Sequence, residues 1–281
     1  MYTLYVLIME NGGRTMEDEN VPKRVFLRKV LYRIDFQFIT EQKQEEIYCY
    51  IAEKYGEYFS DRGYENVVDV ESNKNFNFRP QVVYYLSYPK TEGDGRVIKI
   101  GKTFVFLDID LGITSSNLPY RAWFADIINY LDGMKIFRPT RIGLRKYNTF
   151  FMLNKSIKNI NNIFKIPFFE DVKESSFMLD NFNNLQVYNS EDYSMNFSRN
   201  FSTGLLNNND INNEMAHQIS FDFDLFNEKP EVLSDFCKDA EQGLKDMNDK
   251  ISNFFKEIIS DEVFERVSAG DLLEDYGVIV F

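Results

Sequence analysis

The chain has 281 residues, an apolar fraction of 44% and a formal net charge of −12. This length allows one large domain or two modest ones, with a sizeable core. The acidic balance argues against nucleic acid as the main partner, because binding to phosphates needs a basic surface.

Residues 1–13 read MYTLYVLIMENGG, without the basic start or the small-residue cleavage site of a signal peptide. Two interpretations of this stretch stay open. It is either a strand or an upstream start, with Met16 as the true initiator.

The first half of the chain predicts a strand, a helix, several antiparallel strands and a second helix. The first helix follows Thr40, which is a good N-cap residue. The second follows Ser116 or Asn117 and ends at Gly133. Strands are expected at 30–38, 65–70, 81–89, 96–101 and 102–110, with hairpin signals joining the last three.

The pattern restarts in the second half with a strand at 140–153, TRIGLRKYNTFFML. A short helix at 154–164 follows, with Asn154 as its expected N-cap. Further strands are predicted at 175–189, 192–206 and 216–226, with a polar loop at 207–214.

A long helix is predicted from about 230 to 260, with Pro230 in the first turn. Its apolar residues step by four and three in a heptad pattern. The helix either packs lengthwise across a sheet or forms a coiled coil that makes a homo-oligomer. The residues of the pattern are Leu233, Cys237, Ala240, Leu244, Met247, Ile251, Phe254 and Ile258.

Similar landmarks occur in both halves. RIDF begins at Arg33 and RIGL at Arg141, while the paired aspartates of LDIDL and FDFDL place Asp108 in line with Asp222. We therefore predict an α+β fold, a pseudo-duplicated β-α-β(3–4)-α unit. Its parts are an N-terminal extension (1–23), a first half (24–136), a second half (137–267) and a C-terminal tail (268–281). This order resembles the TATA-box-binding-protein-like fold, a curved antiparallel sheet with helices on one face.

The paired aspartates have two interpretations. Residues i and i+2 of a strand share a face, so Asp108 with Asp110, and Asp222 with Asp224, are predicted on a solvent face opposite the buried Ile109 and Phe223. This alternation is typical of a half-buried antiparallel strand. The alternative is a divalent cation site for phosphoryl chemistry.

The RIGLRKYN motif supplies the candidate binding site. Alternation places Arg141, Gly143, Arg145 and Tyr147 on one face of a strand, and two arginines beside a glycine gap suit an extended anionic ligand or an acidic segment of a protein partner. The glycine is expected to leave an open groove floor. The alternative is that both arginines pair with acids on adjacent strands.

Other chemistry is not indicated. Cys49 and Cys237 are too few for a disulfide framework and are predicted as reduced core thiols, which indicates a reducing, cytoplasmic setting. The single His217 excludes a multi-histidine metal motif. No phosphate-binding loop is present, no cofactor is expected, and no apolar run approaches the roughly 20 residues of a membrane span.

The chain resembles a sporadically distributed prokaryotic family of about this length whose activity is not established. The resemblance rests on VLYRIDFQF, DGRVIKIGKTFVFLDID, AWFADIINYL, RIGLRKYN, ISFDFD and KISNFFKEIISDEVFER. The family motif has Arg-x-Gly-Leu-Arg-Tyr-x-Asn, which Arg141, Gly143, Leu144, Arg145 and Asn148 match, whereas Lys146 replaces the tyrosine. The resemblance implies a gene near mobile or defence-associated genes and assigns no catalytic residues.

Two functions are therefore expected. The first is a non-enzymatic binding or regulatory protein, which the resemblance places within a mobile-element or defence-associated system. The second is a metal-dependent enzyme that acts on a phosphate-containing substrate through the paired aspartates and the arginine strand.

Overall fold

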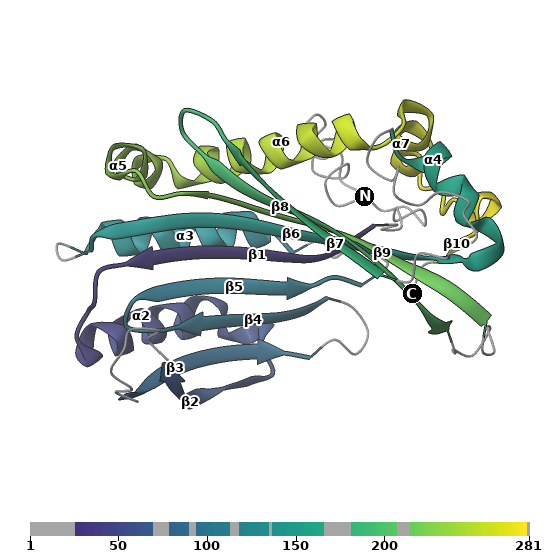
Figure 1. Ribbon diagram of the computed structural model, residues 1–281. Coiled ribbons are helices and arrows are strands. Elements are labelled where there is room, and N and C mark those ends of the chain that lie inside the picture. Colours follow the sequence, from purple (N-terminus) through teal and green to yellow (C-terminus); the bar gives the residue numbers. More distant parts are fainter. Residues whose placement is uncertain are drawn as a thin grey trace.

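A computed structural model describes residues 26–69, 79–89, 94–112, 118–134, 137–165, 181–206 and 214–279. Its strands form one antiparallel sheet in the order β2-β3-β4-β5-β1-β6-β9-β8-β7, and β10 pairs with β6 (Figure 1). The strands are β1 (Leu27–Phe36), β2 (Asp61–Asp69), β3 (Arg79–Tyr88), β4 (Gly95–Ile100), β5 (Phe104–Asp110), β6 (Pro139–Leu153), β7 (Asn181–Asn189), β8 (Ser194–Leu206), β9 (Glu214–Asn227) and β10 (Val278–Ile279).

The helices complete the α+β fold that the sequence predicts. They are α2 (Glu41–Tyr55), α3 (Tyr120–Asp132), α4 (Ile160–Ile163), α5 (Pro230–Lys238), α6 (Ala240–Ile258) and α7 (Asp261–Ser268), with 3-10 turns η1 (Gly56–Tyr58), η2 (Asn154–Asn159) and η3 (Glu274–Tyr276). In Figure 1, α2 and α3 lie behind the strands, and α5 and α6 run along one side of the sheet.

Alternation along the strands separates a buried face from an open one. On β1 and β6, residues such as Ile34 and Leu144 are fully buried beneath the helices, whereas Arg33, Asp35 and Arg145 beside them are more accessible. Ile109 and Phe223 are also fully buried, which confirms the prediction for both aspartate-containing strands. We call the other side, which carries Arg141 and Arg145, the open face.

The caps of the first two helices follow their sequence signals in part. The Thr40 side chain accepts a hydrogen bond from the Lys43 backbone N–H, as predicted for an N-cap. Gly133 ends α3, also as predicted. Pro119 stands at the N-cap position of α3, while Ser116 and Asn117 lie outside the described residues.

The predicted long C-terminal helix is in fact two helices. Asp239, with φ −142° and ψ 71°, ends α5, and its side chain caps α6 by accepting from the Gln242 backbone N–H. The heptad residues are nevertheless buried within the chain, except for the partly buried Phe254. Their burial confirms packing across the sheet, where α6 contacts β6, β9 and α3.

Other local predictions were wrong or incomplete. Asn154 does not cap an α-helix, because the segment after β6 begins as the 3-10 turn η2 without a side-chain cap. The tail includes β10, whose Val278 pairs with Met152. Met16 and the loop residues 207–213 lie outside the described residues.

The two cysteines lie in different environments. Cys237 is buried, as predicted, and burial raises the pKa of its thiol to about 12. Cys49 is exposed, so its prediction as a core thiol was wrong. It lies on α2 between Ile47 and Ile51, which face the core, on the side of the helix turned away from the sheet.

A polar cluster joins α2 to α3 behind the sheet. Tyr50 and Tyr55 each donate from their hydroxyl to Asp126 Oδ2 at 2.7 Å, and Lys54 Nζ pairs with Oδ1 at 2.5 Å. Tyr50 also stacks on Tyr130, with ring centroids 3.7 Å apart. The cluster fixes the two helices against each other.

Among the described helices, none combines the length and apolar character needed to cross a membrane.

Candidate functional site

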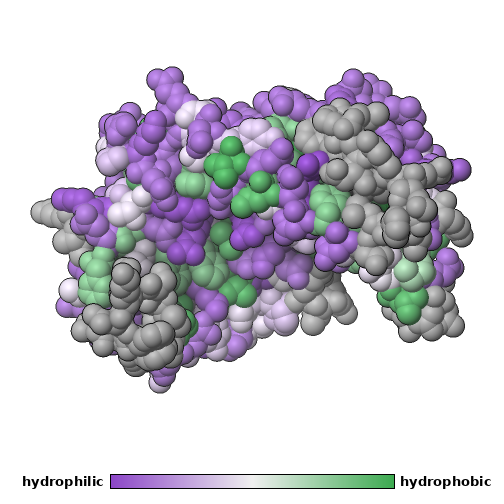
Figure 2. Space-filling view, viewed as in Figure 1, coloured by the Kyte–Doolittle hydropathy of each residue, from purple (hydrophilic) through white to green (hydrophobic). Residues whose placement is uncertain are grey.

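All four predicted site residues lie on β6, on the open face of the sheet. Gly143 is buried, whereas Arg141, Arg145 and Tyr147 retain access to solvent. The view in Figure 2 is predominantly hydrophilic, with hydrophobic side chains in small groups. The site is therefore mainly polar, in contrast to the apolar face beneath the helices.

Arg145 forms a two-point contact with Asp222 on the neighbouring strand β9. Its Nε donates to Asp222 Oδ1 at 2.8 Å, and its Nη2 donates to Oδ2. The hydrogen bonds that Arg145 donates to Asp222 raise the pKa of its guanidinium, while burial acts in the opposite direction. Two parallel N–H donors on one carboxylate fix the orientation of the arginine as well as its charge.

A second ion pair lies on the other side of the central strand pair. Lys29 Nζ on β1 lies 2.7 Å from Asp108 Oδ2 on β5. The other carboxylate oxygen of Asp108, Oδ1, is buried and has no hydrogen-bond partner among the described residues. Asp108 and Asp222 are thus each paired with a cation of the adjacent strand.

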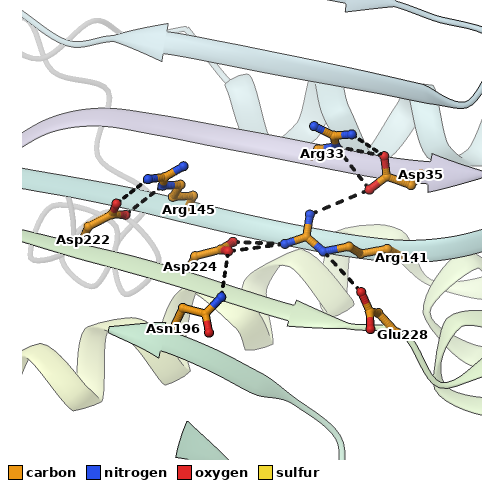
Figure 3. Close-up of polar contacts among 8 residues, drawn as sticks. All are labelled: Arg33, Asp35, Arg141, Arg145, Asn196, Asp222, Asp224 and Glu228. Carbon is orange, nitrogen blue, oxygen red and sulfur yellow. Dashed lines mark hydrogen bonds and ion pairs between the residues drawn. The ribbon is translucent and has the colours of Figure 1, made fainter. Parts of the chain in front are cut away.

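Arg141 is the centre of a separate cluster that joins three strands (Figure 3). Its Nη2 contacts Asp224 Oδ1 at 3.3 Å, its Nη1 lies 3.7 Å from Asp35 Oδ2, and its Nε lies 3.8 Å from Glu228. The guanidinium also lies 4.7 Å from the ring centroid of Phe226. Both arginines therefore pair with acids on adjacent strands, as the alternative interpretation predicted.

Gly143 does not leave an open groove floor, so that prediction was wrong. A Cβ at this position would lie 3.5 Å from Arg141 Nη1, because the arginine side chain folds back along the strand over the glycine. This path brings the Arg141 guanidinium to the Asp224 carboxylate. In the register of β6 and β9, Asp224 is the residue opposite Arg145. The space over Gly143 is filled by the Arg141 side chain and is not open to a ligand.

A cavity of about 330 Å³ lies over the seam between β1 and β6, and we call it the seam cavity. Its lining includes Lys29 and Leu31 from β1 and Arg145 and Tyr147 from β6. Sequence reasoning identified Arg145 and Tyr147 but missed Lys29 and Leu31. Their signal was the alternation of β1, which places them on the same face as the motif residues of β6 once the two strands are known to pair.

The aspartate pairs do not converge. Asp108 lies on β5 and Asp222 on β9, with β1 and β6 between them. Three strand spacings of about 4.8 Å separate the two by roughly 14 Å, which is too far for one metal ion. Within the described ranges, no three His, Cys, Asp or Glu side chains are grouped as metal ligands.

Two further polar residues of interest are part of the core. His217 contacts Thr203 Oγ1 at 2.9 Å and Asn154 Oδ1 at 2.8 Å, and burial lowers the pKa of its imidazole. Lys146 is fully buried and donates to Asn248 Oδ1 on α6. Both side chains bind neighbouring elements together on the helix side.

Comparisons with known proteins give no match. No family model matches the sequence, and no curated protein or solved structure shows significant similarity to it.

Proposed function

We propose that this chain is a non-enzymatic binding or regulatory protein whose binding site is the seam cavity. The observation that carries the proposal is the position of two cations, Lys29 and Arg145, on a cavity with an apolar and an aromatic wall from Leu31 and Tyr147. A volume of this size is within the range of small ligand pockets. It also suits one or two side chains of a partner protein.

The charges around the cavity favour an anionic group. The lining includes both cations. Their partners, Asp108 for Lys29 and Asp222 for Arg145, are not part of the lining. Lys29 carries three N–H donors, and one suffices for Asp108. Arg145 uses Nε and Nη2 for Asp222, and Nη1 has no hydrogen-bond partner in the described part of the chain. Oriented cations with unused donors suit a carboxylate or phosphate.

We infer further that the cavity lies on an approximate two-fold axis between duplicated halves. In the β1–β6 register, Val30 pairs with Lys146. A rotation about this pair exchanges Lys29 with Arg145 and Leu31 with Tyr147, the four lining residues. The neighbouring strands support this relationship, because Leu31 pairs with Asp108 and Tyr147 pairs with Asp222. The alignment differs from the sequence-based match of Arg33 with Arg141.

This symmetry extends the analogy with a duplicated saddle. β5 and β9 each end the run of strands in their half, and each lies beside the first strand of that half. We propose on this basis that the open face is the saddle surface of a TATA-box-binding-protein-like fold adapted to an acidic chain. Its use within a mobile-element or defence-associated system follows from the family resemblance alone.

The test is affinity purification from the native host with wild type, Arg145→Ala and Lys99→Ala. Lys99 is the matched control, because it is a cation on the open face that pairs with Glu65 at 2.6 Å, away from the seam cavity. We expect a specific partner or small molecule to be lost with Arg145→Ala and retained with Lys99→Ala, while circular dichroism shows an intact fold. An unchanged set of partners would leave Arg145 with a structural role only.

A further inference from the structure

The two ends of the sheet differ in how they are protected. β7 and β2 are the outer strands of the sheet order. In the described part of the chain, β7 pairs on one side with β8, without a register shift from Asn181↔Ser202 to Asn189↔Ser194. The outer side of such a strand presents backbone N–H and C=O groups that can pair with another strand.

β2 has the features that protect an edge strand, and β7 lacks them. The β2 sequence DRGYENVVD contains four charged residues and a glycine. The β7 sequence NFNNLQVYN contains no charged residue, no proline and no glycine. Charges and prolines normally prevent pairing between sheet edges, so β7 is the better suited to association of the two edge strands in the described part of the chain.

β7 also exposes large apolar side chains on the open face. Leu185 is 61% exposed and Val187 is 60% exposed. Two residues apart, they share one face of the strand. On the opposite face of β7, Tyr188 packs against Phe254 of α6, with ring centroids 5.0 Å apart, and this contact anchors the strand to the core.

We propose that β7 pairs antiparallel with β7 of a second copy of this chain. A two-fold axis at Leu185 places Leu185 opposite its own copy and Val187 opposite Asn183 of the second copy, so the four exposed apolar side chains form one cluster. The contact is isologous and therefore closes as a dimer. It continues the antiparallel sheet across the two copies.

The absence of charge on β7 allows two copies of this strand to meet. The chain carries a net charge of −12, so two copies repel each other over most of their surfaces. The uncharged β7 strand permits close approach without opposing like charges. An uncharged edge strand is complemented by another uncharged strand, and β7 of a second copy is such a strand. Because one strand pair of about 30 Å is a small contact, the dimer depends on protein concentration.

The test is sedimentation velocity of the full chain over a wide range of concentrations. Wild type is expected to shift from monomer to dimer. Leu185→Lys places two lysines opposite each other at the axis and is expected to remain monomeric. Tyr64→Lys is the matched control, because Tyr64 lies on the other edge strand β2 and is 65% exposed; this variant is expected to dimerise like wild type.

A mixing experiment tests the symmetry. Leu185→Lys and Leu185→Glu are each expected to be monomeric alone and to form a heterodimer when mixed, because the opposed side chains then have opposite charges. A wild-type chain that stays monomeric throughout overturns the proposal. A dimer that persists in Leu185→Lys overturns it as well, because the contact then lies elsewhere.

Discussion

Arg145 and Asp222 form a two-point ion pair across β6 and β9, with 2.8 Å between Nε and Oδ1. Four residues earlier on the same strand, Arg141 contacts three acids at longer distances. They are Asp35 on β1, Asp224 on β9 and Glu228 directly after β9. The two arginines differ in exposure, since the Arg141 side chain is 24% exposed and that of Arg145 is 53% exposed. We conclude that Arg141 holds the strands together and that Arg145 is accessible to a ligand.

This division predicts different losses of stability. Arg141→Ala removes the shared partner of Asp35 and Asp224, and we expect it to lower the free energy of unfolding by about 1–3 kcal/mol. Arg145→Ala affects a pair whose arginine is about half exposed to solvent, and we expect a loss below about 1 kcal/mol. Urea unfolding of both variants measures this difference. Equal losses would contradict the separation of the two roles.

The thiols are predicted to differ sharply in reactivity. Cys49 is exposed, whereas burial raises the pKa of the Cys237 thiol to about 12. Because the thiolate is the reactive form, an aromatic disulfide reagent should modify one thiol in the folded protein and both in denaturant. Cys49→Ser should abolish the fast reaction. A fast reaction that survives in Cys49→Ser would show that Cys237 is accessible.

The Asp126 cluster predicts a pH dependence of stability. Burial alone would raise the pKa of Asp126, but hydrogen bonds from Lys54, Tyr50 and Tyr55 outweigh it and hold the pKa below the usual 3.8. A carboxylate with a lowered folded-state pKa stabilises the protein above its unfolded-state pKa, and this contribution is lost as the pH falls through the folded-state value.

We therefore expect Asp126→Asn to be less stable than wild type at pH 7. The difference should stay constant down to about pH 4 and shrink below it. Urea unfolding at several pH values measures both curves. A difference that does not change between pH 7 and about pH 3 would mean that ionisation of Asp126 does not contribute.

The alternation of residues in the strands was predictable from the sequence. Ile109 and Phe223 follow a period of two, which identifies a strand with one buried face and also explains why the aspartates next to them are accessible. The arginine face of β6 was predictable for the same reason. The break at Asp239 was not, because the heptad pattern continues across it and hides the change from α5 to α6.

The partners across strands could not be predicted from one sequence. The seam cavity depends on the pairing of Leu31 with Arg145, which are far apart in the chain. The burial of Lys146 could not be predicted either. Its hydrogen-bond acceptor in the core is Asn248 of α6, which is far away in the sequence. Cys49 was wrongly predicted in the core because it was assigned to the apolar face of the helix that follows Thr40.

The most direct test of the seam cavity is photo-crosslinking in the native host from position 147. A benzophenone amino acid replaces Tyr147, and the same group at Tyr64 on β2 provides the control. We predict a discrete adduct, protein or small molecule by its mass, that forms from position 147, is absent from position 64 and disappears when Arg145→Ala is added. An adduct from position 147 that persists in Arg145→Ala, or the absence of any adduct there, would contradict the proposed binding site.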